Sequence, residues 1–155
     1  MFRHGFLRKV PFFLLFIFFL SACGGAGVKV ISAEYVDSIN VGGVFYNYEG
    51  QKIVELHLDF NFDASVTEDL DPQSDDFRDE LFGILHEGAH FYNGDEEVES
   101  TYGYWPDEAG VDFAKDMTLF YVVPESSPDE DLRFVFDGDI LGDEDAGLDT
   151  TLNFN

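Results

Sequence analysis

Residues 54–63 alternate strictly between apolar and polar side chains. The apolar members are Val54, Leu56, Leu58, Phe60 and Phe62, and the polar members are Glu55, His57, Asp59, Asn61 and Asp63. Side chains two residues apart lie on the same face of a β-strand, so this period of two predicts a strand with one buried and one solvated face. Such a strand needs neighbouring strands and a second layer to cover its apolar face. The pattern therefore favours a β-rich fold.

Six further short segments have strand character, and turn-forming Gly, Pro, Asp and Asn residues separate them. They are 28–36, 44–48, 98–105, 117–123, 132–136 and 148–154. We expect 44–48 to pair with the alternating strand through a turn at Glu49-Gly50. About seven short strands predict an all-β fold, a β-sandwich. Its predicted core includes Val54, Leu56, Leu58, Phe60, Leu119, Tyr121, Leu132 and Phe134.

The exception to this pattern is the segment 74–91. Ser74-Asp75-Asp76 has the composition of a helix N-cap, and Phe77, Leu81, Ile84 and Leu85 follow it at helical spacing. We expect a short helix that crosses between the two sheets. The alternative is a strand pair over 81–92 that turns at Gly88. The fold is thus predicted to hold one or two short helices.

The N-terminal segment has the composition of a signal peptide. Arg3, Arg8 and Lys9 precede an apolar run of 11 residues, Val10–Leu20. A spanning helix needs about 20 apolar residues, whereas the h-region of a signal peptide has about 7–15. The segment is therefore predicted to target the chain and to be removed.

Leu20-Ser21-Ala22-Cys23 resembles the lipobox of bacterial lipoproteins, and Cys23 is the only cysteine of the chain. The resemblance implies that residues 1–22 are cleaved off and that the Cys23 thiol carries a diacylglyceryl group. Residues 23–27 would then be the lipidated cysteine and a flexible tether, and residues 28–155 the folded domain. Two or three acyl chains anchor a protein stably in a bilayer, whereas one does not. The resemblance also implies outer-membrane sorting in a Gram-negative organism, because Gly24 is not the Asp that marks inner-membrane retention.

The charge of the chain limits its partners. It has 32 acidic and 8 basic residues, a formal charge of −24; loss of residues 1–22 removes three basic residues and leaves 133 residues with a charge of −27. Nucleic-acid binding depends on clusters of Lys and Arg, so no nucleic-acid partner is expected. The expected partners are the lipid bilayer, through the acylated N-terminus, and an unidentified envelope protein.

The order of lipobox, small tether and strands resembles small bacterial surface lipoproteins that carry an immunoglobulin-like domain of unknown function. The likeness includes residues 117–124 (MTLFYVVP) and 132–136 (LRFVF). It implies an immunoglobulin-like β-sandwich, and because the family has no agreed catalytic residues, only the fold carries over to this chain. The expected function is therefore a non-enzymatic binding or scaffold domain that is displayed at the cell envelope.

One motif favours a different class of protein. His86-Glu87-Gly88-Ala89-His90 matches the HExxH pattern of zinc metallopeptidases. On a helix, His86 and His90 would face the same side and share a Zn²⁺, and Glu87 would act as the general base. The metzincin continuation is absent, since Asn93 and Glu96 stand where Gly and His or Asp are needed. A small zinc metallopeptidase is the alternative function, with His86, Glu87 and His90 as its site.

Two other groups of residues are candidate ligand sites. The acidic stretch Asp137–Asp149 has carboxylates suited to Ca²⁺, but Gly147 and Leu148 break the EF-hand pattern. Tyr102, Tyr104 and Trp105 are a candidate platform for stacking carbohydrate, although aromatic residues in strands belong more often to the core. The default expectation is therefore that the folded domain holds no metal and no cofactor.

Overall fold

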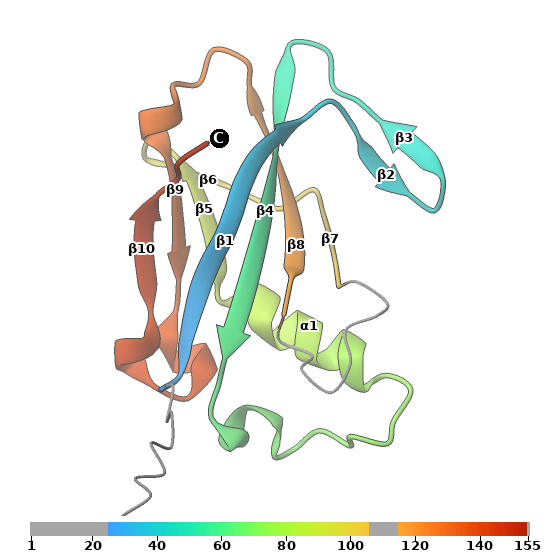
Figure 1. The fold of residues 1–155 in the computed structure, drawn as a ribbon, viewed down its shortest axis with the longest axis vertical. Coiled ribbons are helices and arrows are strands. Elements are labelled where there is room, and N and C mark those ends of the chain that lie inside the picture. Colours follow the sequence, from blue (N-terminus) through green and yellow to red (C-terminus); the bar gives the residue numbers. More distant parts are fainter. Residues whose placement is uncertain (1–24, 106–114, 155) are drawn as a thin grey trace, which may run out of the picture.

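The computed structural model describes residues 25–105 and 115–154. The predicted signal peptide, residues 1–22, and Cys23 lie outside the described residues. Ten strands and one α-helix are present in these two ranges (Figure 1). The strands are β1 (Gly27–Val36), β2 (Ile39–Val41), β3 (Val44–Tyr46), β4 (Gln51–Asn61), β5 (Ala89–Asn93), β6 (Glu96–Val98), β7 (Tyr102–Tyr104), β8 (Met117–Pro124), β9 (Leu132–Phe136) and β10 (Leu148–Thr151), and the helix is α1 (Phe77–Glu87).

The strands form two four-stranded antiparallel sheets and a separate hairpin. One sheet has the order β1-β4-β8-β7, the other has the order β10-β9-β5-β6, and β2 pairs with β3. Short 3₁₀ helices lie in the connections, at Ala64–Thr67, Asp129–Asp131, Gly138–Leu141 and Glu144–Ala146. The expectation of an all-β fold is confirmed at this level.

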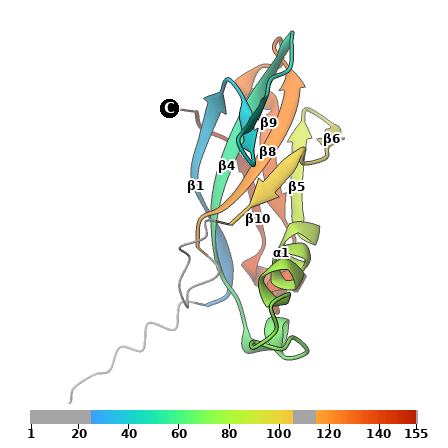
Figure 2. The ribbon, with the colours of Figure 1, turned by 90° about the vertical axis from the view of Figure 1, so that its right-hand side faces the viewer.

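The two sheets form two layers and share one core (Figure 2). Phe91 of β5 stacks on Tyr121 of β8 with 4.3 Å between ring centroids, and Phe60 of β4 lies 5.1 Å from Phe136 of β9. Burial of apolar area of this kind is the main stabilising contribution to a fold. All eight core residues predicted from the sequence are at most 2% exposed.

The alternating segment is the inner strand β4, which pairs with β1 on one side and β8 on the other. Val54, Leu56 and Leu58 are fully buried, whereas His57 and Asp59 lie on the outer face and remain partly exposed. The period of two therefore identified both the strand and its buried face.

Two predicted strand arrangements are wrong. The segment 44–48 does not pair with β4, because β3 pairs with β2 across Gly42 and Gly43, whose φ angles are +59° and +87°. Two consecutive residues with positive φ form the type I′ turn that suits a two-residue hairpin loop. The predicted strand 98–105 is also two strands, since β6 ends at Val98 in one sheet and β7 begins at Tyr102 in the other.

Helix α1 connects the two sheets, as expected. The alternative strand pair over 81–92 is wrong in its first arm, which is helical, whereas its second arm after Gly88 coincides with β5. The buried face of α1 carries Phe77, Leu81 and Leu85, which recur at helical spacing. Asp79 and Glu80 lie in its first turn, where negative charge interacts favourably with the helix dipole. The chain then enters β5 directly after Gly88.

Candidate functional site

The HExxH segment does not lie on one helix. Helix α1 ends at Glu87, the Gly88 carbonyl accepts a hydrogen bond from the Asp137 amide at 3.0 Å, and β5 begins at Ala89. His86 is thus in the last turn of the helix, whereas His90 is the second residue of a strand. The two histidines therefore do not share one face of a helix, which is the geometry on which a shared Zn²⁺ in this motif depends.

Each of the two histidines has a hydrogen-bond partner of its own. His86 Nε2 lies 2.6 Å from Ser100 Oγ, and His90 Nδ1 lies 2.6 Å from Glu97 Oε1 on β6. Within residues 25–105 and 115–154, no group of three or more His, Cys, Asp or Glu side chains is arranged to hold a metal ion. The structure therefore does not bring His86, Glu87 and His90 together as a metal cluster.

The acidic stretch Asp137–Asp149 folds into two consecutive 3₁₀ turns. Asp137 Oδ1 accepts from the Asp139 amide at 3.0 Å, and Asp143 Oδ1 accepts from the Asp145 amide at 3.0 Å. These carboxylates cap the turns that follow them, which is a usual role of Asp at a helix start. A Cβ at Gly138 would lie 2.5–2.6 Å from three backbone atoms of this stretch, so the two turns pack closely.

The structure separates the three aromatic residues of the candidate platform. Trp105 is only 7% exposed and belongs to the shared core, whereas Tyr104 is 37% exposed. On the outer face of the first sheet, Tyr102 and Tyr104 each lie 6.1 Å from Phe120 by ring centroid. The outer-face aromatic group is therefore Tyr102, Tyr104 and Phe120, without Trp105.

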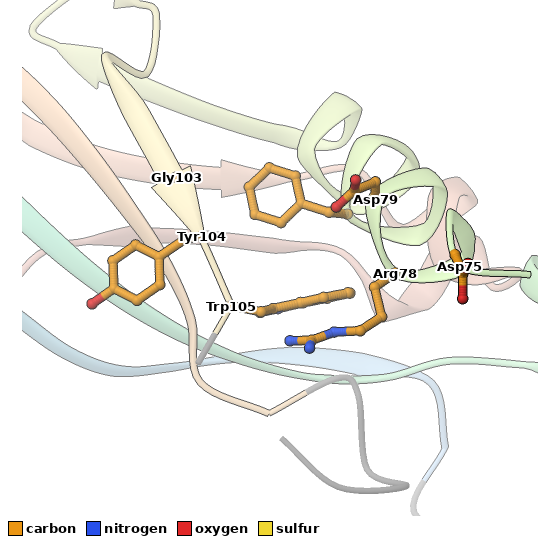
Figure 3. A pocket seen from close by; sticks show the side chains of 7 residues that line it. Asp75, Arg78, Asp79, Gly103, Tyr104 and Trp105 are labelled. Atoms are coloured by element: carbon orange, nitrogen blue, oxygen red, sulfur yellow. The ribbon is translucent and has the colours of Figure 1, made fainter. Parts of the chain in front are cut away.

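A cleft of about 370 Å³ lies between α1 and β7. It is lined by Asp75, Arg78, Asp79, Phe82, Gly103, Tyr104 and Trp105. Figure 3 shows Arg78 extending from the helix alongside the Trp105 indole, while Tyr104 points away from both. Phe82 packs edge-on against Trp105 at 5.7 Å. Arg78 thus lies beside an indole that is already buried, and the seven described lining residues include no nucleophile with an adjacent base.

A polar network occupies the outer face of the sheet β1-β4-β8-β7. His57 Nδ1 lies 2.6 Å from Asp116 Oδ1, and His57 Nε2 lies 2.9 Å from Glu55 Oε1. Burial opposes protonation of this imidazole, but its hydrogen bonds with Asp116 and Glu55 outweigh that effect and raise the pKa of His57 above its ordinary value. The sequence indicated that His57 faces outward, but it gave no sign of Asp116, which is distant in the chain.

A second groove lies between the β2–β3 hairpin and β7. It measures about 190 Å³ and is lined by Ile39, Val41, Tyr46, Tyr48, Thr101 and Tyr102. We call it the hairpin groove. The sequence interpretation missed it, although residues 38–48 contain no charged side chain and include Gly42-Gly43. An uncharged run of this length in so acidic a chain was the available signal.

Comparison with known proteins gives no relative: no family model, no curated protein and no solved structure matches this chain. Among the described residues, no helix has both the length and the apolar character needed to cross a bilayer.

Proposed function

We propose that this chain is an acylated lipoprotein of the bacterial cell envelope that displays a non-enzymatic binding domain. The observation that carries the proposal is Leu20-Ser21-Ala22-Cys23, which places the only cysteine directly after a signal-type apolar run. A thiol at this position is where diacylglyceryl attachment takes place in proteins with a lipobox. Outer-membrane sorting in a Gram-negative organism forms part of the proposal.

We further propose that the displayed domain is an immunoglobulin-like β-sandwich. In the constant-type immunoglobulin fold, strands A, B, E and D form one sheet and strands C, F and G the other. If β1, β4, β5, β7, β8, β9 and β10 are taken as A to G in chain order, the observed sheets read A-B-E-D and G-F-C. Strand β6 then extends the second sheet, and the β2–β3 hairpin is an insertion between A and B. This agreement supports the proposal.

The arrangement of the chain suits display from a membrane. Strand β1 begins at the lower end of the domain in Figure 1, and the β2–β3 hairpin lies at the upper end. Strand β1 begins at Gly27, so the tether has at most four residues, 23–26, which span at most roughly 14 Å at 3.6 Å per residue. An acylated Cys23 would therefore hold the lower end close to the bilayer and leave the hairpin end exposed. The acidic surface opposes adhesion of the domain to anionic lipid headgroups.

Binding is favoured over catalysis by the geometry of the histidines. His57, His86 and His90 each have a hydrogen-bonded side-chain partner, but none of these pairs lies in the cleft between α1 and β7 or in the hairpin groove. The metallopeptidase alternative requires His86 and His90 to converge on one ion, and the observed ends of α1 and β5 give no support to it.

The proposal is tested by a Cys23→Ser variant, with Ser21→Ala as the matched control because alanine preserves a small residue at that lipobox position. Cells are labelled with an alkyne fatty acid, and the labelled protein is followed in membrane and soluble fractions. We expect labelling and removal of residues 1–22 in the native protein and in Ser21→Ala, and neither in Cys23→Ser. A Cys23→Ser protein that is processed and membrane-bound like the native one would refute the proposal.

A further inference from the structure

We propose that the hairpin groove binds an extended peptide segment of another protein, with a large apolar side chain in the groove and basic residues beside it. The inference rests on the proposed function, since it names the class of partner that the displayed domain takes. The groove lies between β7 and the β2–β3 hairpin, and the hairpin is near the upper end of the domain in Figure 1. That end lies away from the start of β1, to which the anchor would be attached.

The size and lining of the groove suit one large apolar side chain. A cavity of about 150 Å³ in an apolar protein interior is enough to bind benzene, and this groove measures about 190 Å³. Three tyrosines, Tyr46, Tyr48 and Tyr102, contribute aromatic surface, and their hydroxyls and that of Thr101 are its polar side-chain groups. Grooves lined by aromatic residues are a recurrent means of binding extended peptides.

The hairpin is held in place and yet leaves apolar side chains exposed. Ile39 is 1% exposed and packs with Ile53 and Phe120 in a small core beneath the hairpin. On β3, however, Val44, Phe45 and Tyr46 are 53%, 68% and 49% exposed. Adjacent exposed apolar residues of this kind mark interaction sites more often than single ones do. A hairpin fixed from below is already ordered before a partner binds.

Both sides of the groove present strands with few neighbours. Within the described residues, β2 and β3 pair only with each other, and β7 pairs only with β8. The edge of a sheet carries backbone N–H and C=O groups that an added strand can bind, as in peptide recognition by strand addition. An extended peptide can therefore use the backbone of either strand while its side chain fills the groove.

The surrounding charge selects a basic partner. Exposed acids stand next to the segments that line the groove: Asp37 before β2, Glu49 after Tyr48 and Glu99 before Thr101. No Lys or Arg occurs in residues 37–49 or 99–104. The processed chain carries −27, so a second copy and an anionic lipid surface are both repelled, whereas Lys and Arg are attracted.

The lining also favours a peptide over a glycan. Among the described residues that line the groove, the polar side chains are three tyrosines and Thr101, and no carboxylate, side-chain amide or guanidinium group is present. Sites for polar small molecules rely on a few precisely positioned groups to fix orientation. A sugar in this groove would lack the paired hydrogen bonds that carboxylates and amides provide.

The test uses the processed protein extracted in detergent and a phage-displayed library of random peptides. We expect selection of sequences with an aromatic or large aliphatic residue flanked by Lys or Arg. Synthetic copies of these peptides should bind about tenfold more weakly to Tyr46→Ser, as expected for loss of a central aromatic contact. The matched control is Ile31→Ser, since Ile31 is 47% exposed on β1 and does not line the groove. Affinity should also fall as salt increases.

A charge-reversal variant, Asp37→Lys, provides a second readout if Tyr46→Ser unfolds, and we expect it to weaken binding of the basic peptides. The inference would be overturned if no peptides are selected, or if the native protein, Tyr46→Ser and Asp37→Lys all bind the peptides equally well. Binding to a glycan array, to anionic vesicles or to a second copy that is lost in Tyr46→Ser, without peptide binding, would also overturn it. Cys23→Ser should leave peptide affinity unchanged, so failure of this inference is distinguishable from failure of the lipid anchor.

Discussion

The substitution Gly88→Ala gives opposite results for the two possible conformations of residues 86–90. In the structure, Gly88 has φ −82°, which any residue adopts, so the backbone does not require glycine. A Cβ at this position would lie 2.8 Å from Phe136 Cζ and 3.0 Å from Ile140 Cγ1. Phe136 is only 2% exposed and has little room to move. Overpacking of this kind costs about 1–3 kcal/mol, so the free energy of unfolding should fall by that amount.

A helix that continued through His90, as in a zinc metallopeptidase, would respond in the opposite way. Replacing glycine inside a helix with alanine raises stability by about 1 kcal/mol. Gly83→Ala is the matched control, because Gly83 lies within α1 and a Cβ there meets no atom within 4 Å. Denaturant unfolding followed by the fluorescence of Trp105, the only tryptophan, measures both variants. Stabilisation of Gly88→Ala to the same extent as Gly83→Ala would refute the observed end of α1.

Three further predictions concern stability. The Tyr121 hydroxyl is buried with no hydrogen-bond partner among the described residues, and burial raises its pKa. Tyr121→Phe should therefore raise the free energy of unfolding by about 1 kcal/mol. A lower free energy of unfolding for this variant, measured by chemical denaturation, would contradict this. The pKa of His57 is raised in the folded protein, so the contribution of His57 to the free energy of unfolding should be complete below its unfolded pKa and lost as pH rises through the folded value. The difference in free energy of unfolding between the native protein and His57→Gln should therefore be largest at acidic pH. A difference that widens toward alkaline pH would be the contrary result. The melting temperature should rise gradually with NaCl concentration, because counterions screen the acidic surface. A saturable rise with Ca²⁺ would instead indicate a specific site if Mg²⁺ does not reproduce it and Asp145→Asn removes it.

Local patterns predicted much of the fold. The alternation of 54–63 identified β4, and the helical spacing of Phe77, Leu81, Ile84 and Leu85 indicated α1 as one of two alternatives. Both signals arise from side chains within one element that share a buried face. The strand β9 was predicted with its observed ends, Leu132 and Phe136, because Asp and Gly residues follow it directly.

Pairing between distant segments could not be predicted in the same way. The run 98–105 is uniformly rich in strand-forming residues, and only tertiary packing assigns its two ends to different sheets. The segment 44–48 was expected to pair across Glu49-Gly50, whereas it pairs across Gly42-Gly43, where both glycines have positive φ. Strand β5 was expected only as the second arm of the alternative strand pair over 81–92, because its first residues complete the HExxH pattern, which favours a helix when considered alone.

Among the candidate sites too, some follow from a local sequence pattern and others depend on how distant segments pair. The position of Cys23 is a local motif and needs no structure to be recognised. The pairing of His57 with Asp116 joins residues 59 positions apart, and the hairpin groove joins three separate segments. Such groups become visible only when the strand order is known.

The intact mass of the protein after extraction from membranes tests the central claim most directly. We predict a chain that begins at Cys23, with the mass of residues 23–155 plus the increment of a diacylglyceryl group and its acyl chains. Release of that increment by base hydrolysis of the esters would identify it as lipid. A chain that retains residues 1–22, or one that begins at Cys23 with no added mass, would contradict the account.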